Sequence, residues 1–338
     1  RFLWPPIYLL MIFSIVNIFG FFKSNKKYFI VIFLLAIQLI DIYPKMKSNF
    51  TEKNSIRVDK PKFTDNIWNI ISEDYDKFRT TYLYNNYGPI FGQLSHFISG
   101  DKIKSTDIIL NASMNRVNSA EARYNLNDLF NKNLISENTA YIVNNVGHLR
   151  HLKYIFAEHD VGFFYRNNLW IMLPNRKNTM TKEDVDSIDK INFNQVESNK
   201  IYRLNFSDRE KFLGLGWTHN FNKEGVWSEG NVATLMLNLD KLKKDNHIFK
   251  ADIEKYRLNN NNNYELKIFV NNKLKNIISF NKKNKSDTLE FKINKNEMIN
   301  STKIDFKFEG LISPFNLRIN PDARKLGMLL KNFSINEL

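Results

Sequence analysis

The chain has 338 residues, of which 43% are hydrophobic and 25% are charged, and this length favours two or three folding units over one. It contains no cysteine, which excludes disulfides, cysteine-bound zinc and a thiol nucleophile. The formal net charge is +14, but the lysines are scattered among acidic residues without an arginine-rich stripe, so nucleic acid is not an expected partner.

Two apolar segments open the chain. Residues 2–22 carry no charge and reach the length of about 20 residues that a membrane-spanning helix needs, and a shorter apolar run covers 28–43. The basic loop at 23–27 is expected to be cytoplasmic by the positive-inside rule. We therefore expect a transmembrane anchor of two helices over 1–44, in contact with membrane lipid. It would place the protein in the bacterial inner (cytoplasmic) membrane, with the later domains on the periplasmic or extracellular side.

The start of the sequence bears on how much of the protein is present. The first residue is Arg1 and not Met, and no small-residue cleavage site follows either apolar run, which argues against a signal peptide. These features favour a fragment of a longer multi-pass protein over a two-helix anchor that is complete in itself.

Mixed patterns follow a polar linker at 45–62. Apolar residues at helical spacing predict helices over 65–79, 89–99, 119–132 and 145–158. Strands are predicted at 80–84, 106–111 and 139–145, and two more flank an Asn167-Asn168 turn. Strands that alternate with helices predict an extracytoplasmic α/β domain over 63–180. No glycine-rich phosphate loop is present, so nothing indicates a nucleotide cofactor.

The C-terminal part alternates strictly between apolar and polar residues. This period of two predicts strands over 249–253, 264–270, 287–294 and 302–308, with a hairpin turn at Asn271-Asn272. Several such strands joined by short turns predict an antiparallel β-sandwich over 198–338, after a linker at 181–197.

The two predicted domains resemble a known layout. Residues 65–78, 112–130, 138–145 and 158–173 look like the extracytoplasmic α/β segment of an uncharacterised family of bacterial multi-pass membrane proteins with the layout of GT-C-type glycosyltransferases. Its Asn–aromatic–Arg motif falls loosely on Asn118 to Arg123, with the aromatic displaced to Tyr124. Residues 216–239, 270–280 and 313–335 resemble the C-terminal β-sandwich of that family, which is similar to modules of surface-polysaccharide glycosyltransferases.

The resemblance implies a role for the longer protein but not for this chain as a catalyst. A GT-C-like parent would use a lipid-linked sugar, and its catalytic acid would lie in an early loop outside this sequence. This chain would then be the non-catalytic outward portion that positions a glycan. An alternative from another class is an envelope module that binds carbohydrate or a partner protein, and no motif supports a third, an independent hydrolase.

Candidate glycan contacts are Trp217, Trp227 and Glu229, because aromatic rings stack on sugars and carboxylates accept hydroxyl hydrogen bonds. The alternative is that both tryptophans fill the sandwich core. The remaining residues of the shared pattern are interpreted as structural; they are Gly216, Gly225, Gly230, Asp322, Arg324 and Gly327. An Asp322–Arg324 pair could fix the last loop or contact a ligand.

Other titratable residues give weaker signals. His148 and His151 lie three apart on a predicted helix and could share a metal, but no third ligand is evident, so no metal is expected. His159 and Asp160 would face opposite sides of a strand. The carboxylate pairs Glu73-Asp74 and Asp184/Asp186 fit a solvated helix face better than glycosidase chemistry.

Overall fold

The structure is a computed structural model that divides into two compact units, 1–62 and 63–338. In the first unit it describes only single residues between 13 and 43. In the second it describes Phe63, Leu94, Phe97, Ile103 and the ranges 65–81, 105–106, 125–143, 145–204, 209–218, 224–256, 264–280, 286–319 and 322–338.

The predicted fold class, a helical membrane anchor with an α/β domain and a sandwich, is wrong as a whole, although the sandwich itself is present. Within the described residues, no helix is long and apolar enough to cross a membrane, and most regular structure is β-strand with short helices. The apolar runs at 2–22 and 28–43, apart from single positions, lie outside the described residues. Apolar length is a necessary condition for a membrane span, and the prediction rested on that length alone.

The first sheet of the second unit has five strands in the order β2-β1-β3-β5-β4. They are β1 (Lys77–Thr80), β2 (Ser105–Thr106), β3 (Thr139–Val143), β4 (Val161–Arg166) and β5 (Leu169–Pro174). β1 pairs in parallel with β2 and β3, whereas β5 is antiparallel to β3 and β4. Asn167 and Asn168 both have positive φ and join β4 to β5 in the tight hairpin that the sequence predicted.

Short helices pack on this sheet, and alternate residues of its strands belong to two separate apolar clusters. The helices are α3 (Asn66–Asp74), a helical segment at 125–131, α6 (Val146–Ile155) and α7 (Lys182–Asp189), with the 3-10 turn η1 (Lys177–Thr179). α3 ends earlier than the predicted helix over 65–79, because Tyr75 is extended and β1 begins at Lys77. Asn145 caps α6, its side chain accepting from the backbone N–H of His148.

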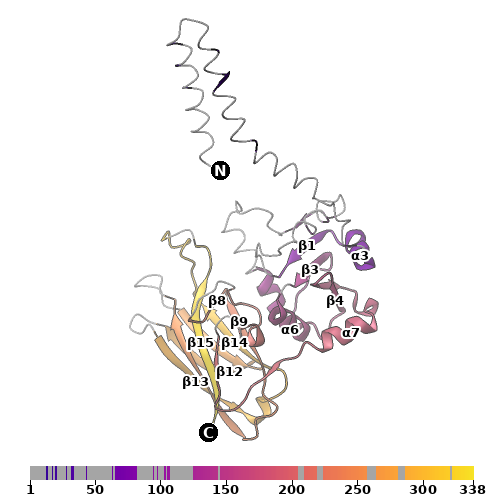
Figure 1. The fold of residues 1–338 in the computed structure, drawn as a ribbon. Helices are drawn as coiled ribbons and strands as arrows, with labels where there is room; N and C mark the ends of the chain where they lie inside the picture. The colour runs from indigo at the N-terminus through magenta and orange to yellow at the C-terminus, as the bar shows by residue number, and fades with distance from the viewer. Residues whose placement is uncertain are drawn as a thin grey trace. The chain divides into compact units, whose positions relative to one another are not determined.

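The C-terminal part forms two sheets whose strands are antiparallel except for the parallel pair β6–β9 (Figure 1). The first has the order β13-β10-β15-β7, with β8 also paired to β15; these are β7 (Ile201–Arg203), β8 (Val226–Glu229), β10 (Asn246–Lys255), β13 (Ser286–Asn294) and β15 (Leu326–Glu337). The second has the order β12-β11-β14-β9-β6; these are β6 (Asn194–Gln195), β9 (Val232–Asn238), β11 (Tyr264–Val270), β12 (Lys273–Phe280) and β14 (Thr302–Glu309). Short helical turns, α8 (Arg209–Phe212) and η2 (Lys295–Glu297), connect strands.

The predicted β-sandwich is confirmed. One apolar cluster joins residues of both sheets, including Phe249 and Phe333 from one and Phe306 from the other. β11 alternates between buried and partly exposed residues along its whole length, as the sequence pattern required. Asn271 and Asn272, both at positive φ, turn β11 into β12.

Helix α6 connects the mixed sheet to the sandwich. It contacts α8 and β9, and the backbone N–H of Leu215 donates to His151 Nδ1 at 3.1 Å. Arg150 donates from the same helix to the backbone carbonyls of Asn192, Glu210 and Lys211. The segment 181–197, predicted as a linker, contains α7 and β6 and lies within this compact unit.

Candidate functional site

Trp217 lies in the core of the sandwich. Its side chain is buried, its ring meets Phe306 edge-on with centroids 6.0 Å apart, and its Nε1 donates to the backbone carbonyl of Thr234 at 2.8 Å. A buried indole whose N–H has an internal partner presents no face to a ligand.

Trp227 and Glu229 lie on β8 beside it, but they do not share one surface with Trp217. Trp227 is half-buried and meets Tyr256 edge-on at 5.2 Å between centroids, whereas Glu229 is buried. The structure therefore leaves Trp227 as the only open aromatic of the three predicted contacts, and its binding role stays a prediction.

The predicted motif glycines allow close approach of backbones around β8 and the start of β15. Gly216 has φ +87°, and a Cβ there would lie 1.9 Å from the carbonyl oxygen of Val232. A Cβ on Gly225 would lie 2.3 Å from the carbonyl oxygen of Leu330, and one on Gly327 would meet the ring of Phe308. The backbone N–H of Gly230 donates to the backbone carbonyl of Lys325.

Asp322 and Arg324 form a bidentate pair just before β15. Arg324 donates from Nε to Asp322 Oδ1 at 2.9 Å and from Nη2 to Oδ2 at 2.7 Å. Asp322 also accepts from the Arg324 backbone N–H, so the pair closes a local turn. This geometry agrees with the interpretation that the pair fixes the last loop.

The other titratable candidates lie on helices and turns around the mixed sheet. Asp160 accepts from the Lys177 backbone N–H, and Asp184 is buried at the start of α7. No group of three His, Asp or Glu side chains suited to a metal occurs in the part of the chain that the structure describes. His151 uses Nδ1 to accept from Leu215, so that lone pair is occupied.

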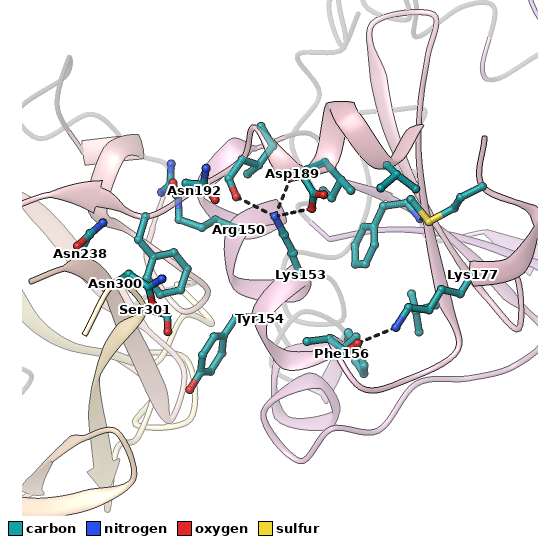
Figure 2. A pocket seen from close by; sticks show the side chains of 18 of the residues that line it. Arg150, Lys153, Tyr154, Phe156, Lys177, Asp189, Asn192, Asn238, Asn300 and Ser301 are labelled. Carbon is teal, nitrogen blue, oxygen red and sulfur yellow. Dashed lines mark hydrogen bonds and ion pairs between the residues drawn. The ribbon is translucent and has the colours of Figure 1, made fainter. Parts of the chain in front are cut away.

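A cavity of about 720 Å³ lies beside α6. Its walls come from α6, β4, η1, α7 and the residues after α7, and from Asn238, Asp240, Asn300 and Ser301 of the sandwich. Figure 2 shows Asn238, Asn300 and Ser301 on one side, Lys177 on the other, and Tyr154 and Lys153 of α6 between them. We call this cavity the α6 pocket.

An aromatic pair forms part of the wall of the α6 pocket. Tyr154 and Phe193 lie with ring centroids 5.8 Å apart at an interplanar angle of 46°, and both are partly exposed. The Tyr154 hydroxyl donates to no described residue, so its polar end is available inside the pocket. Partly exposed rings with an unused hydroxyl can take up the apolar face of a ligand and bond its edge.

The sandwich side of the α6 pocket is polar. Asn300 and Ser301 precede β14, and their side chains form no hydrogen bond with the described residues. Asn238 Oδ1 accepts a hydrogen bond from the backbone N–H of Asp240, and this bond orients the amide of Asn238. The exposed Asp240 carboxylate forms no ion pair with the residues that the structure describes. Hydrogen-bond donors and acceptors of the sandwich thus line the same pocket as the aromatic pair.

Three cations also line the α6 pocket. Arg150 is 5% exposed, and burial lowers the pKa of its guanidinium to about 10. Lys153 donates to the carbonyl of Ile188 at 2.9 Å and pairs with Asp189 at 3.4 Å. Lys177 donates to the carbonyl of Ala157 at 2.8 Å.

His151, on the same helix, is fully buried against Gly214 and Leu215. Burial lowers its pKa well below the usual value, and the charges of Lys303 and His148 lower it further. Its Nε2 is buried without a hydrogen-bond partner. The folded protein therefore favours the neutral form of the His151 ring over the protonated form.

We expect acid to destabilise the protein through His151. Since the folded pKa lies below the unfolded value of about 6.5, the unfolded state binds the proton more readily. The stabilisation that comes from the neutral His151 ring is therefore complete above a pH of about 6.5. Below that pH, the free energy of unfolding falls by up to about 1.4 kcal/mol per pH unit. Urea unfolding at pH 7.5 and 5.5 should show this loss, and His151→Gln should reduce it. An equal loss in the variant would contradict the assignment.

Comparisons with known proteins give only distant similarity. No protein-family model and no curated protein matches the chain. Among solved structures, the cycloalternan-forming enzyme from Listeria monocytogenes in complex with a pentasaccharide substrate matches at 11% identity and TM-score 0.27, over 59% of this chain and 18% of that one. The CBM36-1 domain of a multidomain xylanase from the hindgut metagenome of Trinervitermes trinervoides matches at 16% identity and TM-score 0.25, over 41% and 97%. A CBM36 carbohydrate-binding module in complex with calcium and xylotriose matches at 9% identity and TM-score 0.22, over 42% and 92%. Scores this low carry no inference about the ligand of this chain.

Sequence reasoning did not find the residues of the α6 pocket. Arg150, Lys153 and Tyr154 are three and four apart, which places them on one side of α6, and this spacing was a usable signal. Phe193, Asn238 and Asn300 come from distant segments, and no local pattern could have grouped them.

Proposed function

We propose that this chain is a carbohydrate-binding protein and that the α6 pocket is its binding site. The observation that carries the proposal is the pairing of Tyr154 and Phe193 with the polar side chains of Asn238, Asn300 and Ser301 across one cavity. A sugar has one apolar face of C–H groups and a rim of hydroxyls. It therefore needs an aromatic surface and several donors and acceptors together.

The size and polarity of the pocket support the same ligand class. A volume of about 720 Å³ lies within the range of about 300–1,000 Å³ for small-molecule sites. Amide side chains can both donate to and accept from a hydroxyl, whereas carboxylates only accept. Asn238, Asn300 and Asp240 thus satisfy a hydroxyl-rich ligand better than a purely apolar one.

Removing the aromatic wall is expected to weaken binding. We expect Tyr154→Ala to reduce affinity for the glycans that the wild-type chain selects on an array by about tenfold, since stacking and one hydrogen bond together are worth about 1.5 kcal/mol. Isothermal titration with the selected glycan measures the change.

Tyr165→Ala is the matched control, because Tyr165 is exposed on β4, packs on Trp170 and lies outside the pocket. Its affinity should equal that of the wild type. Unchanged binding by Tyr154→Ala together with loss in Trp227→Ala would move the site to the Trp227–Tyr256 pair and contradict the proposal.

The wider biological setting predicted from the sequence stays a proposal. We propose a place in the assembly or modification of bacterial cell-surface polysaccharide, outside the cytoplasm. Deleting the gene should then alter the amount or composition of the surface polysaccharide, and an unchanged surface polysaccharide would contradict this role.

A further inference from the structure

One end of the α6 pocket is apolar. The wall of this end comes from the end of α6, from β4, from the residue that follows η1 and from α7. The apolar side chains in it are Phe156, Val161, Phe163, Met180, Val185 and Ile188. All of them except Val185 belong to one apolar cluster or pack against it, so the surface that they form is continuous. We call this surface the apolar end of the pocket.

The apolar end is accessible from outside the core. Val185 is 41% exposed on α7, and Met180 is partly exposed. The sulfur of Met180 accepts from the backbone N–H of Phe163 at 3.5 Å, which holds this side chain against β4. Partly exposed aliphatic side chains are stabilised when another apolar group removes them from water. The apolar end is therefore suited to an apolar group of a ligand.

The lysines of the pocket do not oppose this use. Lys177 donates to the carbonyl of Ala157, and Lys153 donates to the carbonyl of Ile188 and pairs with Asp189. Their ammonium groups are thus held by groups of the protein itself. The methylene stems of both lysines can pack on an apolar group, as long cationic side chains commonly do.

The polar side chains lie at the other end of the same cavity. Figure 2 shows Asn238 and Asn300 on one side and Phe156 on the other, with Tyr154 of α6 between them. The hydroxyls and C–H groups of a sugar would use the polar end and the Tyr154 ring, and they would leave the apolar end uncovered. A ligand that fills the cavity therefore has a polar part and an apolar part.

We infer that the α6 pocket binds a glycoside with an apolar aglycone, with the sugar at Tyr154, Asn238 and Asn300 and the aglycone at the apolar end. A substituent on the anomeric carbon leaves the other ring hydroxyls free for the polar end, which is why we assign the apolar group to that position. The inference rests on the proposed function and narrows its ligand class from carbohydrate in general to glycosides of apolar alcohols.

The test compares the methyl and hexyl glycosides, in both anomeric forms, of each glycan that the wild-type chain selects on an array. Isothermal titration with the full chain, below the concentration at which the hexyl glycoside forms micelles, should show at least about tenfold higher affinity for one hexyl anomer. Each methylene group that is buried raises affinity by about fourfold. The heat-capacity change of binding should also be more negative for the hexyl glycoside, because it buries more apolar surface.

Val185→Asn tests the apolar end itself. This variant should lower affinity for the hexyl glycoside by about threefold or more and leave affinity for the methyl glycoside nearly unchanged, because the aglycone and not the sugar lies at Val185. Val146→Asn is the matched control, since Val146 is a valine of nearly equal exposure, 40%, at the start of α6 and outside the pocket. It should bind both glycosides as the wild type does.

The outcomes separate the two proposals. Equal affinity for the methyl and hexyl glycosides, with Tyr154→Ala weakening both, would overturn the apolar aglycone and leave carbohydrate binding in place. A hexyl preference that Val185→Asn does not reduce would place the alkyl chain elsewhere and would also overturn the inference. If the array selects no glycan, or if Tyr154→Ala does not change binding, the proposed function itself is wrong.

Discussion

Trp217→Ala is expected to destabilise the protein by about 3–5 kcal/mol, the typical cost of truncating a buried tryptophan. Trp217 is 5% exposed in the sandwich core, so its removal leaves a cavity beside Phe306. The variant also leaves the buried carbonyl of Thr234 without the indole N–H that now satisfies it. Urea unfolding followed by circular dichroism measures the change.

Two controls separate packing from binding. Trp217→Phe should recover part of the loss, since it refills much of the volume but not the hydrogen bond. Trp227→Ala should change the free energy of unfolding much less, because Trp227 is only half-buried. If Trp217→Ala kept wild-type stability but lost glycan binding, Trp217 would be a ligand contact and its place in the core would be wrong.

Asp184→Ala is expected to destabilise the protein by about 3 kcal/mol. Asp184 is buried and accepts from Arg166 Nη1 at 2.6 Å and Nη2 at 3.1 Å, and it closes the capping box of α7 with Thr181. Its loss breaks a buried ion pair and a helix cap together. Arg166 keeps its second partner, Asp65, which limits the effect.

The pH dependence gives a second readout for the same residue. Burial alone would raise the pKa of Asp184, but the hydrogen bonds and charge of Arg166 and the hydrogen bonds of Thr181 outweigh it and hold the pKa below its usual value. The stabilisation is therefore complete above the unfolded pKa of about 3.9 and is lost as the pH falls through the folded value. Asp186→Ala, an exposed position on the same helix, should leave stability nearly unchanged. Equal effects of the two variants would contradict the role of Asp184.

The strands of the sandwich could be predicted because each buries one face. β11 alternates between buried and partly exposed residues, and in β14 only the buried Asp305 departs from such alternation, so a period of two located both strands almost to the residue. β15 was not predicted as a strand, although it lies between β10 and β7 at the centre of its sheet. Its pairing with β10 shifts register at one point, and Met328, Leu329 and Leu330 are all buried, so its sequence does not alternate.

Helix boundaries and the fold class were harder to predict for physical reasons. Tyr75 and Phe78 are buried and follow α3 at helical spacing, so the pattern extended the helix into β1. Apolar length predicted the membrane anchor, and the described residues do not contain one. The α6 pocket needed tertiary structure, because its aromatic and polar walls come from segments up to about 150 residues apart in the sequence.

Hydrogen–deuterium exchange with and without a glycan that the chain selects tests the central claim most directly. If the α6 pocket binds it, exchange should slow in α6 around Lys153 and Tyr154, around Phe193, and at 238–240 and 299–301. Slowing confined to β8 and the residues around Tyr256, with no change in α6, would place the glycan at Trp227 and contradict the account.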